Sequence, residues 1–246
     1  MRNIWIIASR EYKAYFSNFI AYAFTFFMLL ITGIVVYNSL VISVNSFGQY
    51  PPPDVGIVIG PLMFLLVFAC PAFTMRLISE EQRLGTIELL LTAPVRDWEL
   101  VVGKWLGSFL FVLTNIAITF IYPLVLHWLI TPGIDQGPLV SGYLGVFLVT
   151  GAFLGMGVAV SSFFSNQVAS YIVTFGLIVI FWWIFGIFAQ AGGAQSAIFR
   201  HLDMGSQFYD TMFQGEISLS GVVYFLSLIV GFLTLGSVSV ETRRWR

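Results

Sequence analysis

The sequence predicts an all-α integral membrane protein with six transmembrane helices. Hydrophobic residues make up 58% of the 246-residue chain and charged residues only 9%, whereas soluble globular domains have roughly 45–50% apolar and about 25% charged residues. The mean hydropathy is +0.91. Long apolar runs alternate with short charged stretches, and nothing resembles the repeat of about ten alternating residues that marks a transmembrane barrel. We therefore interpret residues 1–246 as a single transmembrane domain.

Each predicted span is an apolar run at least as long as the roughly 20 residues that a helix needs to cross the hydrocarbon core. The spans are expected at residues 20–44, 55–78, 100–130, 139–164, 168–190 and 221–240. Small residues recur at helical spacing, as Gly103 and Gly107 in the third span and as Gly151, Gly155 and Ala159 in the fourth. This spacing lets helices approach closely, and we expect the close contacts to lie within one subunit rather than at a dimer face.

Residues 1–19 are predicted to form an amphipathic helix on the membrane surface. One face carries Ile4, Trp5, Ala8, Tyr12, Tyr15, Phe16 and Phe19, and the opposite face carries Arg2, Arg10 and Lys13. Cations on the polar face are typical of interfacial helices. Ile6 and Ile7 do not fit this pattern. The alternative is a simple stop signal before the first span.

A charged segment, residues 79–99, interrupts the apolar chain. Its ionisable residues are Glu80, Glu81, Arg83, Glu88, Arg96, Asp97 and Glu99, and each would cost roughly 2.5–3.5 kcal/mol at the centre of a bilayer. The segment must therefore lie in water. A small apolar patch around Leu89–Leu91 indicates a docking surface for a soluble protein; the alternative is a solvated turn.

Local signals subdivide this charged segment. Thr86 is expected to cap a short helix that ends before Pro94, and Asp97 is expected to cap the third span. Lys104 near the start of that span is expected to extend to the interface.

Residues 191–220 combine glycines with charged and aromatic side chains. The set includes Arg200, His201, Asp203, Asp210 and Glu216, together with Phe199, Phe208, Tyr209, Met212 and Phe213. This mixture favours short helices at the external interface over another span.

The distribution of Lys and Arg predicts the orientation in the membrane. All of the 11 Lys and Arg residues except Arg200 fall at the two ends of the chain or in and beside the charged segment. The positive-inside bias then predicts a multi-pass protein of the cytoplasmic (inner) membrane with both termini cytoplasmic. The net charge of −1 gives no basic surface for nucleic acid.

The chain lacks the residues of a recognisable catalytic or metal site. It has no phosphate-binding G-x-x-x-x-G-K-[ST] motif, His127 has no readable catalytic partner, and His201 and Asp203 are too few for a metal site. Cys70 lies in an apolar run and is expected to be a packed thiol. The middle of each span has no Asp, Glu, Lys or Arg, which argues against ion coupling. An apolar or amphipathic substrate, or none that crosses the chain, is expected.

Residues 80–95, EEQRLGTIELLLTAPV, resemble the hallmark between the second and third spans of ABC type-2 membrane permeases. The gliding-motility-type permeases look most similar, because residues 208–233, FYDTMFQGEISLSGVVYFLSLIVGFL, also resemble the end of those proteins. Two departures are Gln207, where a histidine is frequent, and Ser220-Gly221, where a basic–acidic pair is frequent.

The resemblance implies a non-enzymatic permease subunit of a type-2 exporter. Cytoplasmic ABC ATPase subunits would carry ATP and Mg, with no cofactor in this chain, and a second permease and a membrane subunit with a large external domain are further implied partners. Residues 1–19 would be the elbow helix and residues 79–99 the coupling segment. The ATPase-coupling residues carried over by position are Glu80, Glu81, Arg83, Gly85, Thr86, Glu88, Leu90 and Pro94, with Glu88 the favoured contact. The alternatives are a scaffold that passes ATPase motion to an external protein without substrate passage, or an intramembrane lipid-modifying enzyme.

Overall fold

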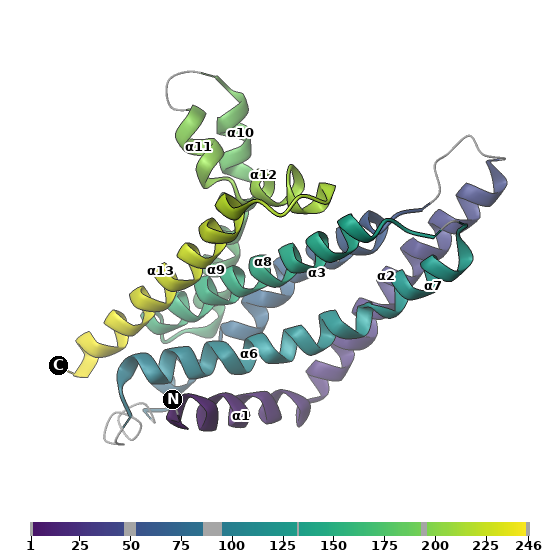
Figure 1. Ribbon diagram of the computed structural model, residues 1–246. Helices are drawn as coiled ribbons and strands as arrows, with labels where there is room; N and C mark the ends of the chain where they lie inside the picture. The colour runs from purple at the N-terminus through teal and green to yellow at the C-terminus, as the bar shows by residue number, and fades with distance from the viewer. Residues whose placement is uncertain (1, 47–52, 86–94, 132, 193–195, 245–246) are drawn as a thin grey trace.

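The computed structural model describes residues 2–46, 53–85, 95–131, 133–192 and 196–244, and every regular element within them is a helix (Figure 1). Six stretches are long and apolar enough to cross a membrane. The predicted all-helical class and the number of spans are therefore confirmed for the described residues.

The six spans contain nine α-helices and one π-helical turn. They are α2 (Phe19–Asn45), α3 (Gly56–Thr74) with α4 (Ser79–Arg83), α6 (Asp97–Thr119) with α7 (Ile121–Leu129), α8 (Gln136–Phe163), α9 (Gln167–Val179) with the π-helical turn Ile180–Ile184 and α10 (Phe185–Gln190), and α13 (Leu219–Arg244). α13 leads to the C-terminal end of the chain.

Three spans are less regular than the sequence predicted, the fifth because of its π-helical turn. The third span is divided at Phe120 into α6 and α7. Pro123 explains the break, because it lacks the N–H that would donate to the carbonyl of Thr119 one turn earlier. The second span ends its α-helix at Thr74, and residues 75–78 form turns before α4 begins.

α1 (Arg2–Phe16) lies along α6 (Figure 1). A Cβ atom added at Gly103 would lie 2.8 Å from Cβ of Ile7, and one at Gly107 would lie 2.6 Å from Cβ of Glu11. The expected close packing within the subunit is confirmed here. The predicted apolar face was partly wrong, because Ile7 packs against α6 whereas Trp5 is 61% exposed. Placement of α1 at a membrane surface stays a prediction.

α8 is the central helix, packed against α13, α3, α6 and α9. In the most apolar 18-residue stretch of α8, 89% of the residues are buried, whereas in the corresponding stretch of α2 only 17% are. The small residues of α8 admit α13: an added Cβ at Gly151 would lie 2.9 Å from Cδ1 of Ile229, and Gly236 faces Ala159. The small-residue pattern of the fourth span therefore also serves packing within the subunit. Cys70 is buried, as expected.

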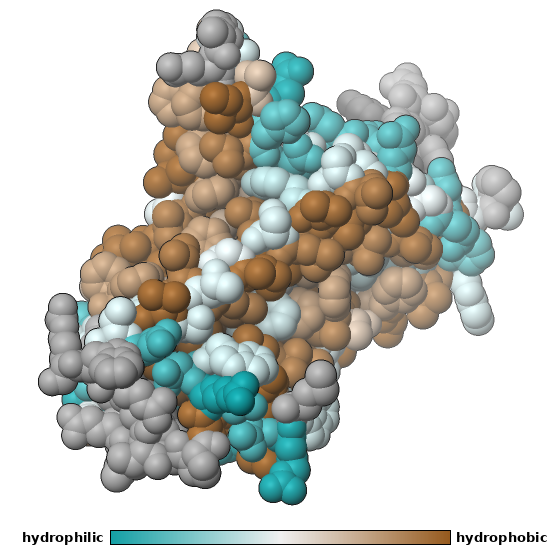
Figure 2. All heavy atoms as spheres, turned by 60° about the vertical axis from the view of Figure 1, so that its left-hand side comes forward, coloured by the Kyte–Doolittle hydropathy of each residue, from teal (hydrophilic) through white to brown (hydrophobic). Residues whose placement is uncertain are grey.

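The two ends of the molecule differ in character. The N- and C-terminal ends of the chain and the start of α6 lie at one end, which we call the terminal end (Figure 1). The other end, called the opposite end, carries α10, α11 (Ser196–Leu202), α12 (Met204–Tyr209) and the 3-10 turn Met212–Gln214. Short helices are present in this segment, as predicted, and their placement at an external interface stays a prediction. Figure 2 shows a broad apolar surface between hydrophilic atoms at the two ends.

Candidate functional site

The sequence-predicted coupling residues fall into two groups. Glu80, Glu81 and Arg83 lie in α4, and Gly85 follows it with a φ of 71°. Thr86, Glu88, Leu90 and Pro94, with the short helix expected there, lie outside the described residues.

The link between α3 and α4 is anchored to the end of α8. The backbone N–H groups of Ile78 and Ser79 both donate to Oγ of Ser161, each at 3.0 Å. Nε2 of Gln82 donates to the carbonyl of Ser162 at 2.8 Å. Ile78, Ser79 and Ser161 are buried, so these bonds replace the helical hydrogen bonds that the turn leaves unmade. α4 is thereby fixed to the central helix.

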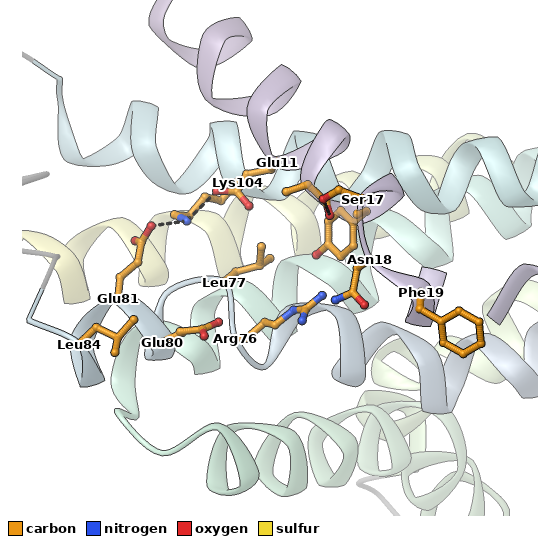
Figure 3. A pocket seen from close by; sticks show the side chains of 12 residues that line it. Glu11, Ser17, Asn18, Phe19, Arg76, Leu77, Glu80, Glu81, Leu84 and Lys104 are labelled. Atoms are coloured by element: carbon orange, nitrogen blue, oxygen red, sulfur yellow. Dashed lines mark hydrogen bonds and ion pairs between the residues drawn. The ribbon is translucent and has the colours of Figure 1, made fainter. Parts of the chain in front are cut away.

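A buried lysine joins three separate elements. Nζ of Lys104, on α6, lies 3.0 Å from Oε1 of Glu11 on α1 and 2.8 Å from Oε1 of Glu81 on α4. The Lys104 side chain is 2% exposed. Arg10 adds a longer contact, with Nη2 3.3 Å from Oε1 of Glu11 and 4.0 Å from Oε1 of Glu81. The expectation that Lys104 extends to the interface was wrong, because α1 and α4 cover it and supply carboxylates (Figure 3).

This ion-pair cluster borders a cavity of about 560 Å³ between α1, α4 and the start of α2. Figure 3 shows Glu81 and Lys104 at one end of the cavity and Arg76 extending toward Asn18 at the other. Arg76 forms no ion pair with another described residue. Within the described part of the chain, the cavity therefore presents one guanidinium without a directly paired carboxylate, near Glu11 and Glu81, which are paired with Lys104.

α1 is held against the spans by its last two turns. The ring of Tyr15 stacks on Phe111 of α6, with centroids 4.7 Å apart, and its hydroxyl donates to the carbonyl of Phe73 at 2.8 Å. Burial, reinforced by the negative charge of Glu11, raises the pKa of the Tyr15 phenol well above its usual value. The group stays a neutral donor and links α1 to both α3 and α6.

The start of α6 is capped differently from the sequence prediction. Arg96, not Asp97, occupies the N-cap position, and Oε2 of Glu99 accepts the backbone N–H of Arg96 at 3.1 Å. The same carboxylate oxygen accepts from Nδ2 of Asn3 at 3.1 Å. Glu99 therefore stabilises the N-terminus of α6 and fastens the beginning of α1 to it.

The family model for ABC-2 family transporter proteins matches residues 5–243. This chain belongs to the ABC-2 transporter family. It is a membrane component of an ABC-2 transporter, and permeases of this family work with ABC ATPase subunits. No curated protein matches the chain.

Of the two carboxylates in the ion-pair cluster of this ABC-2 permease, Glu81 on α4 is among the residues predicted from the sequence for coupling, a role that stays a prediction. Glu11 had been assigned to neither face of the N-terminal helix. Glu11 lies four residues after Ile7 and four before Tyr15, so it shares the face that packs on α6. A lone lysine in the first turns of an apolar span requires a carboxylate close by, and this requirement could have directed attention to Glu11.

Proposed function

We propose that this ABC-2 permease couples ATP hydrolysis by separate cytoplasmic subunits to the movement of an apolar or amphipathic substrate across the membrane. Family membership supports the membrane role. The observation that carries the coupling role is the buried ion-pair cluster of Lys104, Glu11 and Glu81, because it makes α1, α4 and α6 one mechanical unit.

Motion at the terminal end has a defined route into the spans. A displacement of α4 acts on α6 through Lys104 and on α8 through Ser161 and Gln82. α1 acts on α3 and α6 through Tyr15. Differential binding of ATP to two states of the ATPase would supply the energy, and the spans would respond as packed rigid bodies.

The charge distribution supports a cytoplasmic location for the terminal end. All Lys and Arg residues except Arg200 belong to the termini or to the segment in and around α4 and the start of α6. We propose that the ATPase contacts this end through α4 and the segment containing Thr86, Glu88, Leu90 and Pro94. ATP and Mg would reside on the ATPase. A second permease and a membrane subunit with a large external domain complete the proposed assembly, which we place in the gliding-motility-type branch.

The composition of the spans supports an apolar or amphipathic substrate. The charged residues within the six helical spans are confined to the turns at the terminal end, such as Lys104 and Glu241. The buried side-chain amide of Asn115, deeper in the spans, is satisfied inside the chain: its Oδ1 accepts from the hydroxyl of Thr25 at 2.5 Å, and its Nδ2 donates to the carbonyl of Phe111 at 2.9 Å. An ion-coupled route would place ionisable groups at this depth.

The first test is co-purification of an ATPase with the chain from solubilised membranes. Arg83 is exposed on α4, so Arg83→Glu should leave the chain folded while reversing a charge on the proposed docking surface. We expect at least about a tenfold loss of bound ATPase or of substrate-stimulated ATP hydrolysis, which corresponds to roughly 1.4 kcal/mol. Glu88→Arg is expected to act in the same direction.

Arg200→Glu is the matched control, because it reverses the same charge at the opposite end. It should leave ATPase binding unchanged. If no ATPase accompanies the unmodified chain, or if the Arg83 and Arg200 variants behave alike, α4 is not the docking surface.

A further inference from the structure

A second cavity lies at the opposite end of the molecule, between α10 and α12. Its volume is about 380 Å³, and three aromatic residues contribute to its lining. Trp182 and Trp183 come from the π-helical turn Ile180–Ile184 and Tyr209 ends α12. The rings of Trp182 and Tyr209 meet edge to face, with centroids 5.6 Å apart. Trp183 and Tyr209 are 42% and 37% exposed, so their rings are open to a ligand.

Two carboxylates line the same cavity. Asp203 is 3% exposed, and its oxygens accept from the backbone N–H groups of Gly205, at 3.1 Å, and Ser206, at 3.2 Å, and from the Ser206 hydroxyl. Gly186 makes room for it on α10, since an added Cβ would lie 2.9 Å from Oδ2 of Asp203. Asp210, the second carboxylate, is exposed at the mouth.

All hydrogen-bond donors to Asp203 in the described chain are neutral. Neither Asp203 nor Asp210 takes part in an ion pair among the described residues, although Arg200 and His201 lie on the neighbouring α11. The described residues that line the cavity therefore include two carboxylates and no cationic side chain. A buried carboxylate in this position attracts a positively charged group more strongly than one in water does.

We propose that this cavity binds an organic ammonium group. Aromatic faces attract an ammonium ion through their quadrupoles, and the carboxylates add direct charge attraction. A metal ion fits less well, because the described residues contain no group of three or more His, Cys, Asp or Glu side chains. An anion would be repelled. The ammonium could belong to a free small molecule or to the head of an amphiphile, whose chain would lie against exposed Ile187 beside Trp183.

Binding can be tested on the purified full chain in neutral-detergent micelles, without reference to transport or to an ATPase. The probes are choline, its neutral isostere 3,3-dimethylbutan-1-ol, and dodecyltrimethylammonium. Tryptophan emission and ligand-observed NMR report binding. We expect saturable binding of choline or dodecyltrimethylammonium and none of the neutral isostere. Binding of choline alone identifies a free ammonium site, and binding only of the amphiphile identifies a head-group site.

Three variants locate the binding. Asp210→Asn removes an exposed charge and should weaken ammonium binding by roughly tenfold, and Trp183→Leu should have a similar effect. Glu216→Gln is the matched control, because it removes a charge from the same end outside the cavity, and it should bind as the unmodified chain does. Equal binding of choline and its neutral isostere, no saturable binding of either ammonium, or identical behaviour of the Asp210 and Glu216 variants would each overturn the proposal.

Discussion

The two ends of the molecule treat buried charge in opposite ways. At the terminal end, the Lys104 ammonium is covered and lies within 3.0 Å of carboxylates from two other elements. At the opposite end, the Asp203 carboxylate is covered as fully but receives only neutral donors from its own short helix. The first arrangement ties distant segments together, whereas the second leaves charge available to a ligand.

This difference separates two roles that composition alone does not distinguish. A buried ion contributes to mechanical connection when its counter-ions come from other elements, because breaking the pair leaves charge uncompensated. A buried ion with neutral local donors fixes only a turn or a cap. We therefore expect that removing a buried charge lowers the free energy of unfolding more at the terminal end than at the opposite end.

The largest expected effect follows removal of the lysine at the terminal end. Lys104→Met leaves the carboxylates of Glu11 and Glu81 without their buried cation, which should lower the free energy of unfolding by about 3–5 kcal/mol. Denaturant unfolding of the purified chain in mixed micelles measures the change. Lys13→Met is the control, because Lys13 is exposed on α1 and should be nearly neutral.

A triple variant shows whether stranded charge causes the loss. Lys104→Met combined with Glu11→Gln and Glu81→Gln removes all three charges, and it should regain part of the stability. If Lys104→Met is as stable as Lys13→Met, the cluster does not connect α1, α4 and α6 energetically.

A smaller loss of stability is expected at the link between α3 and α4. Ser161→Ala removes the shared acceptor of two buried backbone N–H groups, those of Ile78 and Ser79. Leaving buried donors unsatisfied costs about 1–3 kcal/mol. Backbone hydrogen exchange should therefore become faster in the link between α3 and α4 and not elsewhere. Ser227→Ala is a suitable control, since the Ser227 hydroxyl is exposed and bonds only within α13. Equal hydrogen-exchange rates of this link in the two variants would show that Ser161 does not stabilise it.

The sequence was sufficient for features that depend on hydrophobic length and local pattern. The six apolar runs correspond to six candidate spans, and α1 packs on the small residues Gly103 and Gly107. The break at Phe120 was missed because the apolar run continues through Pro123 without a change in composition. The π-helical turn carrying Trp182 and Trp183 had no sequence signal for the same reason.

The ion-pair cluster shows what local pattern does not contain. Glu11 and Lys104 are 93 residues apart, and only the docking of α1 on α6 brings them together. Periodicity placed the helical face of α1 only approximately, so Ile7 was treated as an exception although it packs on Gly103. Pairing of buried charges is decided by tertiary contact, and for Lys104 the sequence had led us to expect a side chain that extends to the interface rather than one paired with Glu11 and Glu81.

The smallest stability effect is expected for Asp203→Asn at the opposite end, although Asp203 is nearly as buried as Lys104. Asparagine caps helices about as well as aspartate, and its side-chain oxygen can still accept the N–H of Gly205 or Ser206. No counter-ion in the described chain is stranded by the change. We expect the free energy of unfolding to shift by less than about 1 kcal/mol, with a clear loss of choline or dodecyltrimethylammonium binding.

Asp203→Ala separates the helix-capping role of Asp203 from its charge, with the same stability and binding measurements. Alanine removes both the capping oxygen and the charge, so this variant should lose about 1 kcal/mol of stability and bind ammonium ligands as weakly as Asp203→Asn does. A loss of 3–5 kcal/mol from Asp203→Asn, comparable to that of Lys104→Met, would mean that the Asp203 charge has a stabilising partner. The two ends would then manage buried charge in the same way, and the buried carboxylate of Asp203 would not be available to an ammonium ligand.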